Sequence, residues 1–89
     1  MTYTFVFGDN FNKELANLKK EDSKIGAKIL DLIMNITQTP FEGIGKPEPL
    51  KGNLQGTWSR RITSKHRLIY EVKEHRVFLI SCYGHYEDK

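Results

Sequence analysis

Residues 39–70 read TPFEGIGKPEPLKGNLQGTWSRRITSKHRLIY, and the periodicity of the chain changes across this stretch. Its first part is a loop, because Thr39-Pro40 ends any preceding helix and the alternating glycines and prolines of residues 43–49 keep the backbone out of regular structure. Its last part has the two-residue alternation of β-strands. A loop of this length in a small domain is either functional or disordered, and alternating prolines favour a fixed path. We therefore expect helices before the loop, strands after it, and loop charges held in defined positions.

The segment before the loop has the pattern of a strand and two helices. Residues 3–7 are aromatic or β-branched and stop at Gly8-Asp9-Asn10, which predicts a strand followed by a helix cap. Apolar residues then recur at helical spacing, first at Phe11, Leu15 and Leu18, and later at Ile25, Ile29, Leu32, Ile33 and Ile36. The charged cluster at 19–22 separates the two runs, and Asp22 or Ser23 can cap the second helix. These signals predict a helical hairpin.

The segment after the loop predicts strands near residues 50–54, 57–63, 67–72 and 77–83, with a polar turn at 73–75. Side-chain parity relates two of them. If an odd number of residues turns the chain near 64–66, Ile62 faces with Leu68, and Arg61 faces with Arg67. A turn with an even number of residues places Arg61 and Arg67 on opposite faces and one guanidinium toward the core, so the odd turn is preferred. We therefore expect Arg61 and Arg67 to share the face opposite the helices.

Length and composition limit the class of protein. The chain has 89 residues, 38% of them hydrophobic and 28% charged, which predicts one folded domain over residues 1–89 rather than a disordered tail. Its net charge of +3 is modest, but the basic surplus lies in residues 46–76, so that half is the candidate surface for a polyanion. Cys82 is the only cysteine and favours a buried structural thiol in a reducing cytosol. No apolar run reaches membrane length and no signal peptide is evident, which predicts a soluble cytoplasmic protein without a membrane partner.

Several side chains have both a structural and a chemical interpretation. Arg60, Arg61 and Arg67 are either a solvated sheet face or, beside a lysine-bearing loop, a phosphate-binding group. Glu48 is either an ordinary exposed carboxylate or a catalytic group aimed by the prolines on each side. Trp58 fits a core-edge aromatic better than a base-stacking platform. Two histidines fall in predicted turns and are interpreted as surface residues: His66 and His75. No metal-ligand spacing, glycine-rich phosphate loop or nucleophilic triad is present in the sequence.

The run KPEPLKGNLQGTWSRRITSKHRLIYEV, preceded by TPFEGIG and followed by a near-terminal His-Tyr pair, resembles the YoeB branch of the RelE superfamily. These are the toxins of bacterial type II toxin-antitoxin pairs. The resemblance implies an α+β fold of the microbial-ribonuclease type, with two N-terminal helices packed on one face of an antiparallel-rich sheet of four to five strands. It also implies ribosome-dependent cleavage of messenger RNA in the decoding site, without a metal or other cofactor.

The resemblance assigns roles to individual residues. Glu48 matches the catalytic glutamate, the general base that takes the proton of the ribose 2′-OH. Arg67 matches the arginine that stabilises the pentavalent phosphate, and His85 matches the general acid that protonates the departing 5′ oxygen. Further substrate- or phosphate-binding positions are matched by Lys51, Arg61 and Tyr86. The expected product carries a 2′,3′-cyclic phosphate.

One departure from the family pattern lies at the C-terminus. Many relatives end on the His-Tyr pair, whereas this chain continues with Glu87-Asp88-Lys89. Either the acids stabilise protonated His85 or disfavour nearby RNA, or the extension is frayed and irrelevant. The Tyr83-Gly84 pair before His85 also loosens the terminal match, so Glu48 and Arg67 rank first among the catalytic candidates.

The resemblance further implies partners: a cognate YefM-type antitoxin, the ribosome and mRNA, operator DNA only as a toxin-antitoxin complex, and a homodimer in the free state. The residues themselves leave two other functions open. One is a catalytically inactive module that binds RNA or operator DNA. The other is a ParE-like gyrase poison, against which Glu48 and His85 argue, since such members lack the carboxylate and the histidine.

Overall fold

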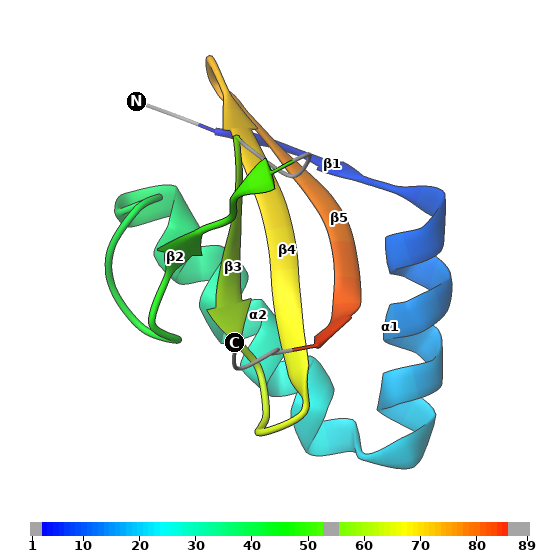
Figure 1. Ribbon diagram of the computed structural model, residues 1–89. Helices are drawn as coiled ribbons and strands as arrows, with labels where there is room; N and C mark the ends of the chain where they lie inside the picture. Colours follow the sequence, from blue (N-terminus) through cyan, green and yellow to red (C-terminus); the bar gives the residue numbers. More distant parts are fainter. Residues whose placement is uncertain (1–2, 53–55, 86–89) are drawn as a thin grey trace.

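The computed structural model describes residues 3–52 and 56–84 together with the backbone of His85. In chain order, the described elements are β1 (Thr4–Phe7), α1 (Asp9–Glu21), α2 (Ser23–Gln38), β2 (Glu48–Pro49), β3 (Thr57–Arg61), β4 (His66–Lys73) and β5 (Arg76–His85) (Figure 1). The expected strand, helical hairpin, loop and strand-rich half are all present. Over the described residues, neither helix is long and apolar enough to span a membrane.

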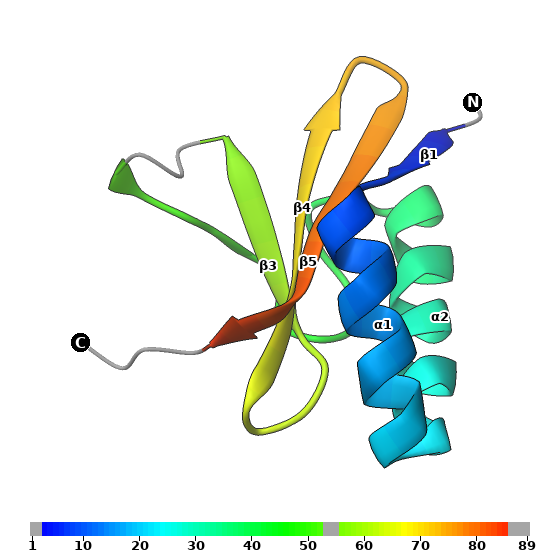
Figure 2. The same ribbon diagram turned by 90° about the vertical axis from the view of Figure 1, so that its right-hand side faces the viewer.

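The strands form one mixed sheet with the order β1-β5-β4-β3-β2. β1 pairs in parallel with β5, whereas the other neighbours are antiparallel. Both helices lie on one face of this sheet, and no helix of the described residues covers the opposite face (Figure 2). We call this opposite face the open face. The expected α+β fold, with two helices on an antiparallel-rich sheet, is confirmed. The face without helices is the one that the fold leaves accessible.

The core lies between the helices and the sheet. The helices bury one apolar stripe each, through Phe11 and Leu18 on α1 and Ile29, Leu32 and Ile36 on α2. The facing sheet residues are also buried: Leu68, Tyr70, Val77, Leu79 and Cys82. Complete burial of one such side chain contributes about 1.5 to 3 kcal/mol, so this layer supplies most of the stability of the small domain.

Both helix N-caps lie where the sequence predicted them, but only the cap of α2 uses a side chain. Asp22 is the N-cap of α2, and its carboxylate accepts a hydrogen bond from the Lys24 amide at 3.0 Å. For α1, however, the N-cap is Gly8 and no side chain caps the helix. The Gly8 amide instead donates to the carbonyl of Leu79 at 3.1 Å, which ties the start of α1 to strand β5. Local sequence signals do not predict this hydrogen bond, because its two partners are far apart in the chain.

The register of β3 and β4 confirms the odd turn and exposes one error in the sequence interpretation. Arg61 pairs with Arg67 and Arg60 pairs with Leu68, so an odd number of residues, 62–66, separates the last paired positions of the two strands. Arg61 and Arg67 therefore share the open face, as expected. Arg60, however, points to the helix side and is completely buried, so it is not part of a common three-arginine face. Neighbouring residues of a strand point to opposite faces, so one of the two adjacent arginines had to be buried.

A strand was expected near residues 50–54, but the described part of this segment, residues 50–52, is not a strand, and the neighbouring strand β2 lies before it. β2 comprises only Glu48–Pro49, and pairing with β3 extends to the Leu50 amide, which donates to Thr57 O at 2.9 Å. Residues 53–54 lie outside the described residues. β2 is at the edge of the sheet, where a proline that lacks an N–H is tolerated. Glu48 is thereby placed on a sheet edge instead of in an irregular loop.

β5 contains irregularities that no local pattern predicted. From Tyr70 to Arg67 β4 advances three residues, while β5 advances five from Leu79 to Gly84. The Glu14 carboxylate of α1 supports this bulged segment, because it accepts from Ser81 Oγ and from the Cys82 amide, both at 2.9 Å. A Cβ on Gly84 would lie 2.8 Å from the Ile69 side chain, so glycine permits the close approach. The bulges bring Gly84 and the His85 backbone opposite Arg67 and His66.

Candidate active site

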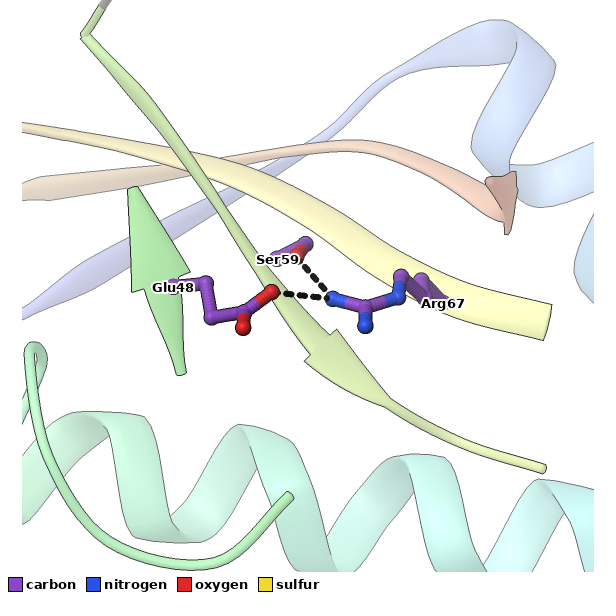
Figure 3. Close-up of polar contacts among 3 residues, drawn as sticks. All are labelled: Glu48, Ser59 and Arg67. Atoms are coloured by element: carbon purple, nitrogen blue, oxygen red, sulfur yellow. Dashed lines mark hydrogen bonds and ion pairs between the residues drawn. The ribbon is translucent and has the colours of Figure 1, made fainter. Parts of the chain in front are cut away.

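Glu48, Ser59 and Arg67 meet on the open face of the sheet (Figure 3). Glu48 lies on β2, Ser59 on β3 and Arg67 on β4, and β3 lies between the other two strands. The pairing of Glu48 with Ser59 places these two residues side by side. Arg67 Nη1 donates to Glu48 Oε1 at 3.0 Å and to Ser59 Oγ at 2.7 Å. The two first-ranked catalytic candidates, 19 positions apart in the chain, are thus in direct contact.

The two charges of this pair differ sharply in exposure. The Arg67 side chain is 4% exposed and the Glu48 side chain is 53% exposed. The guanidinium is therefore largely shielded from solvent, where its charge acts strongly on a neighbouring anion. The carboxylate reaches solvent and an incoming ligand. This arrangement offers a proton acceptor and an anion-stabilising cation side by side.

A pocket of about 190 Å³ adjoins this pair and is lined by Arg61, Thr63, Ser64 and Arg67. Thr63 Oγ1 accepts from the backbone amides of Lys65 and His66, at 3.1 and 3.0 Å, which holds the β3–β4 turn that forms one wall. Arg61 is exposed at the mouth. Two guanidiniums and two hydroxyls around one hollow suit an anion such as a phosphate.

The structure describes the other predicted site residues to different extents. Lys51 is exposed, two residues beyond β2. The backbone of His85 lies opposite His66, one residue beyond the Arg67–Gly84 pair, while its side chain, Tyr86 and the extension at 87–89 lie outside the described residues. The described residues include no group of three His, Cys, Asp or Glu side chains arranged to hold a metal ion.

Ser59 was missed by sequence reasoning. It is completely buried, and its hydroxyl fixes the same Nη1 that reaches Glu48. The signal was available, because Ser59 alternates with Arg61 along β3 and therefore faces the same side as Arg67. A buried serine between a tryptophan and two arginines marks a polar contact on that face.

Three other interpretations are settled by packing. Trp58 is partly buried against the core and its ring lies 4.8 Å from that of Phe41, as expected for a core-edge aromatic. His66 is not a plain surface residue: it is half-buried and stacks on Tyr83 with ring centroids 5.7 Å apart. His75 is exposed, as expected.

Burial also governs the titration of two residues on the helix side of the sheet. It raises the pKa of the Tyr70 phenol, although the hydrogen bond from Arg60 and the charge of Arg60 act in the opposite direction. Burial, together with the nearby Glu14 carboxylate, raises the pKa of the Cys82 thiol to about 12. Cys82 is therefore a neutral, buried thiol and a poor nucleophile, as expected from its position in an apolar strand.

Comparison with known proteins identifies the family. A family model described as the YoeB-like toxin of bacterial type II toxin-antitoxin systems matches residues 7–86. Toxin YoeB of Escherichia coli K12 is 52% identical over 68 residues, which cover 76% of this chain and 81% of the relative. Toxin YoeB of Synechocystis is 51% identical over 69 residues, covering 78% of this chain and 80% of the relative.

Solved structures give the same result. A YoeB/ParE toxin from Agrobacterium tumefaciens has a TM-score of 0.87 at 42% identity, covering 97% of this chain and 100% of that one. A YoeB dimer from Staphylococcus aureus has a TM-score of 0.88 at 37% identity, with the same coverage. A heterotetrameric YoeB-YefM toxin-antitoxin complex from Staphylococcus aureus has a toxin chain with a TM-score of 0.84 at 37% identity, again with the same coverage. The chain described here therefore belongs to the YoeB family of toxins of bacterial type II toxin-antitoxin systems.

Proposed function

We propose that this toxin is a metal-independent endoribonuclease that cuts messenger RNA in the decoding site of the ribosome and so inhibits translation. The observation that supports this most is the contact between an exposed carboxylate and a buried guanidinium, Glu48 and Arg67, at 3.0 Å beside a basic pocket. Backbone cleavage at a ribose needs a base for the 2′-OH and a cation for the phosphate. Both groups are present and close enough to act on one nucleotide.

In the proposed reaction, Glu48 takes the proton of the 2′-OH and the 2′ oxygen attacks the adjacent phosphorus. Arg67 stabilises the negative charge that builds on the phosphoryl oxygens. The bond from phosphorus to the 5′ oxygen then breaks, and His85 gives that oxygen a proton. The products are a 2′,3′-cyclic phosphate and a 5′-hydroxyl end.

Binding of RNA changes the partners of the ion pair. A phosphate entering the pocket competes with Glu48 for the Arg67 guanidinium, because both are anions that accept from its N–H groups. The Glu48 carboxylate, 53% exposed, is thereby released to accept from the 2′-OH. The remaining substrate- or phosphate-binding roles are assigned to Lys51, Arg61 and Tyr86.

The test is cleavage of a translated message by purified toxin and ribosomes, with Glu48→Gln as the central variant. The amide oxygen of Gln can still accept from Arg67, so the fold is retained while the base is lost. We expect the cleavage rate to fall about 10²- to 10⁴-fold, with ribosome binding unchanged. Glu42→Gln is the matched control, since Glu42 is an exposed glutamate of the same loop, and it should cleave like the unmutated toxin.

The same assay distinguishes the other functions. An unmutated toxin that leaves ribosome-bound mRNA intact overturns the nuclease and favours an inactive RNA- or operator-DNA-binding module. Random cuts in naked RNA overturn the ribosome dependence. DNA damage that precedes the arrest of translation in expressing bacteria indicates a ParE-like gyrase poison.

The proposed setting is the bacterial cytoplasm, with a cognate YefM-type antitoxin that neutralises the toxin and joins it on operator DNA. The solved structures of a YoeB-YefM complex and of a YoeB dimer from Staphylococcus aureus support the proposal that the present toxin binds an antitoxin and forms a homodimer. Co-expression with a cognate YefM-type antitoxin should restore growth. Light scattering of the purified toxin should give the mass of a dimer, and a monomer would overturn that part.

A further inference from the structure

The helix side of β3 carries a second buried arginine, Arg60, whose bonding is unlike that of a substrate-binding group. All five N–H donors of its guanidinium have a protein acceptor. Nε donates to Tyr70 Oη at 3.0 Å, and Nη1 donates to Asn35 Oδ1 at 2.6 Å and Ile44 O at 3.1 Å. Nη2 donates to Thr39 O at 2.6 Å and Glu42 O at 3.0 Å. Every acceptor is neutral, and no donor is left for a ligand.

Three of the five acceptors are carbonyls of the loop that leads from α2 to β2. The two side-chain acceptors bind the same loop a second time, because Asn35 Oδ1 accepts from the Ile44 amide at 3.1 Å and Tyr70 Oη donates to Pro40 O at 2.8 Å. The loop therefore closes around Arg60. We call Arg60, Asn35 and Tyr70 the loop anchor.

The loop fits the anchor closely at its glycines. Gly43 and Gly45 have φ of 122° and 80°, a region that favours glycine. A Cβ on Gly43 would collide with Asn35 Oδ1, and one on Gly45 would lie 2.7 Å from the Leu32 side chain. Gly45 O also accepts from the Arg61 amide at 2.6 Å, which joins the loop to β3. The loop path is thus fixed up to three residues before Glu48.

β2 itself holds Glu48 only weakly. It has two residues, both exposed, at the edge of the sheet, and Pro49 has no N–H to give to β3. Attachment through the preceding loop therefore contributes much of what keeps the Glu48 carboxylate at 3.0 Å from Arg67.

We propose that Arg60, acting with Asn35 and Tyr70, is a positioning residue for the reaction: it anchors the loop at residues 39–45 and thereby sets the position of Glu48. This inference rests on the proposed function, since it concerns the base of that reaction. Arg60 itself does not touch RNA.

Asn35→Ala tests the inference, because it removes one acceptor of Arg60 and the partner of the Ile44 amide while leaving the charge of Arg60 in place. The single-turnover cleavage rate at saturating ribosomes should fall about 10- to 100-fold, as expected when a catalytic group is misplaced. The ribosome concentration at half-saturation should not change. Hydrogen exchange should accelerate at the Ile44 and Arg61 amides and stay slow along β4 and β5.

Two companion variants separate positioning from general loss of structure. Asn35→Asp keeps both acceptor bonds through a carboxylate oxygen and should restore most of the rate. Asn17→Ala makes the same substitution at an exposed helical position of α1 and should behave like the unmutated toxin. If Asn35→Ala melts below the assay temperature, Tyr70→Phe removes only the hydroxyl from the same anchor and should give the same pattern.

The decisive comparison combines Asn35→Ala with Glu48→Gln. If the anchor acts through Glu48, Asn35→Ala should cause no further loss once the base is gone. An undiminished further loss, or a normal rate in Asn35→Ala despite a rapidly exchanging Ile44 amide, overturns the inference. The proposed nuclease is judged separately, by whether the unmutated toxin cuts and Glu48→Gln does not.

Discussion

The two faces of the sheet each hold a buried arginine, and the two residues differ in what they contact. Arg60 on the helix face is 0% exposed and donates to five neutral acceptors of the protein itself. Arg67 on the open face is 4% exposed and donates to Ser59 and to a carboxylate that is half in solvent. Burial of an arginine alone therefore does not indicate function. The exposure of its acceptor does, because an exposed acceptor can be exchanged for a substrate.

The chemistry of the acceptors follows the same division. Carbonyl, amide and phenol oxygens that are covalently part of a folded loop cannot leave, so the bonds of Arg60 contribute to stability and to the shape of the loop. A flexible glutamate on a two-residue edge strand can move at little cost. We expect substitutions of Arg60 to be measured mainly as changes in stability, and substitutions of Arg67 mainly as changes in activity.

Among substitutions of the two buried arginines and of Cys82, Arg67→Met should give the largest effect. Without the guanidinium the phosphate charge is unstabilised, and the cleavage rate should fall about 10²- to 10³-fold, equivalent to roughly 3 to 4 kcal/mol of barrier. The free energy of unfolding should fall by about 1 kcal/mol, because the buried Ser59 hydroxyl loses its partner while exposed Glu48 regains water and Met fills much of the volume. Ribosome-dependent cleavage and urea unfolding measure the two quantities. A variant that unfolds but, where folded, cuts normally would reverse the roles of the two arginines.

Arg60→Met should give the next largest effect, and mainly on stability. The substitution leaves three partly buried loop carbonyls and the Asn35 and Tyr70 oxygens without their donor, at a cost of about 2 to 3 kcal/mol in the free energy of unfolding. Urea unfolding followed by the fluorescence of Trp58, which packs on Phe41 of the anchored loop, reports the loss. Arg61→Met, at the exposed neighbouring position, is the control and should unfold near the normal urea concentration. Equal stability of the two variants would contradict the structural role of Arg60.

Titration of the Cys82 thiol should give the smallest effect. It tests whether the helix side of the sheet excludes solvent from this residue. Burial raises the pKa of Cys82 from 9.0 to about 12, so above about pH 9 the unfolded chain loses a proton that the folded protein keeps. The contribution to stability is complete below pH 9 and is lost as the pH rises toward 12, by about 1 kcal/mol at pH 10. Unfolding free energies of the unmutated toxin and Cys82→Ala, measured from pH 7 to 10.5, should therefore converge with rising pH. Parallel curves would show that the thiol is accessible in the folded state.

Much of the fold was predictable because its signals are local. The helical stripes, the Asp22 cap and the stop at Thr39-Pro40 depend on neighbours within one or two turns. The bulges of β5 were not predictable, because they depend on Glu14 in a distant helix and on the fit of Gly84 against Ile69. The same holds for the start of α1, where the Gly8 amide donates to the carbonyl of Leu79 on a distant strand.

The candidate site was predictable to a similar degree. Parity placed Arg61 with Arg67, and the family resemblance selected Glu48, but Arg60 was grouped with the phosphate-binding candidates. Its burial follows from the alternation of adjacent strand residues, whereas its five acceptors follow from a loop whose glycine conformations the sequence does not reveal. Ser59 was overlooked although the same alternation pointed to it.

The parallel pairing of β1 with β5 has a consequence for the order in which the chain acquires its structure. Thr4 aligns with Arg76, 72 positions later, whereas β3, β4 and β5 follow one another through short turns. Closing the longer segment costs more chain entropy, so we expect the hairpins that carry Ser59 and Arg67 to form before β1 joins the sheet. On this expectation the face that holds Ser59 and Arg67 is assembled from neighbours in the sequence, and the N-terminal strand completes the edge of the sheet last.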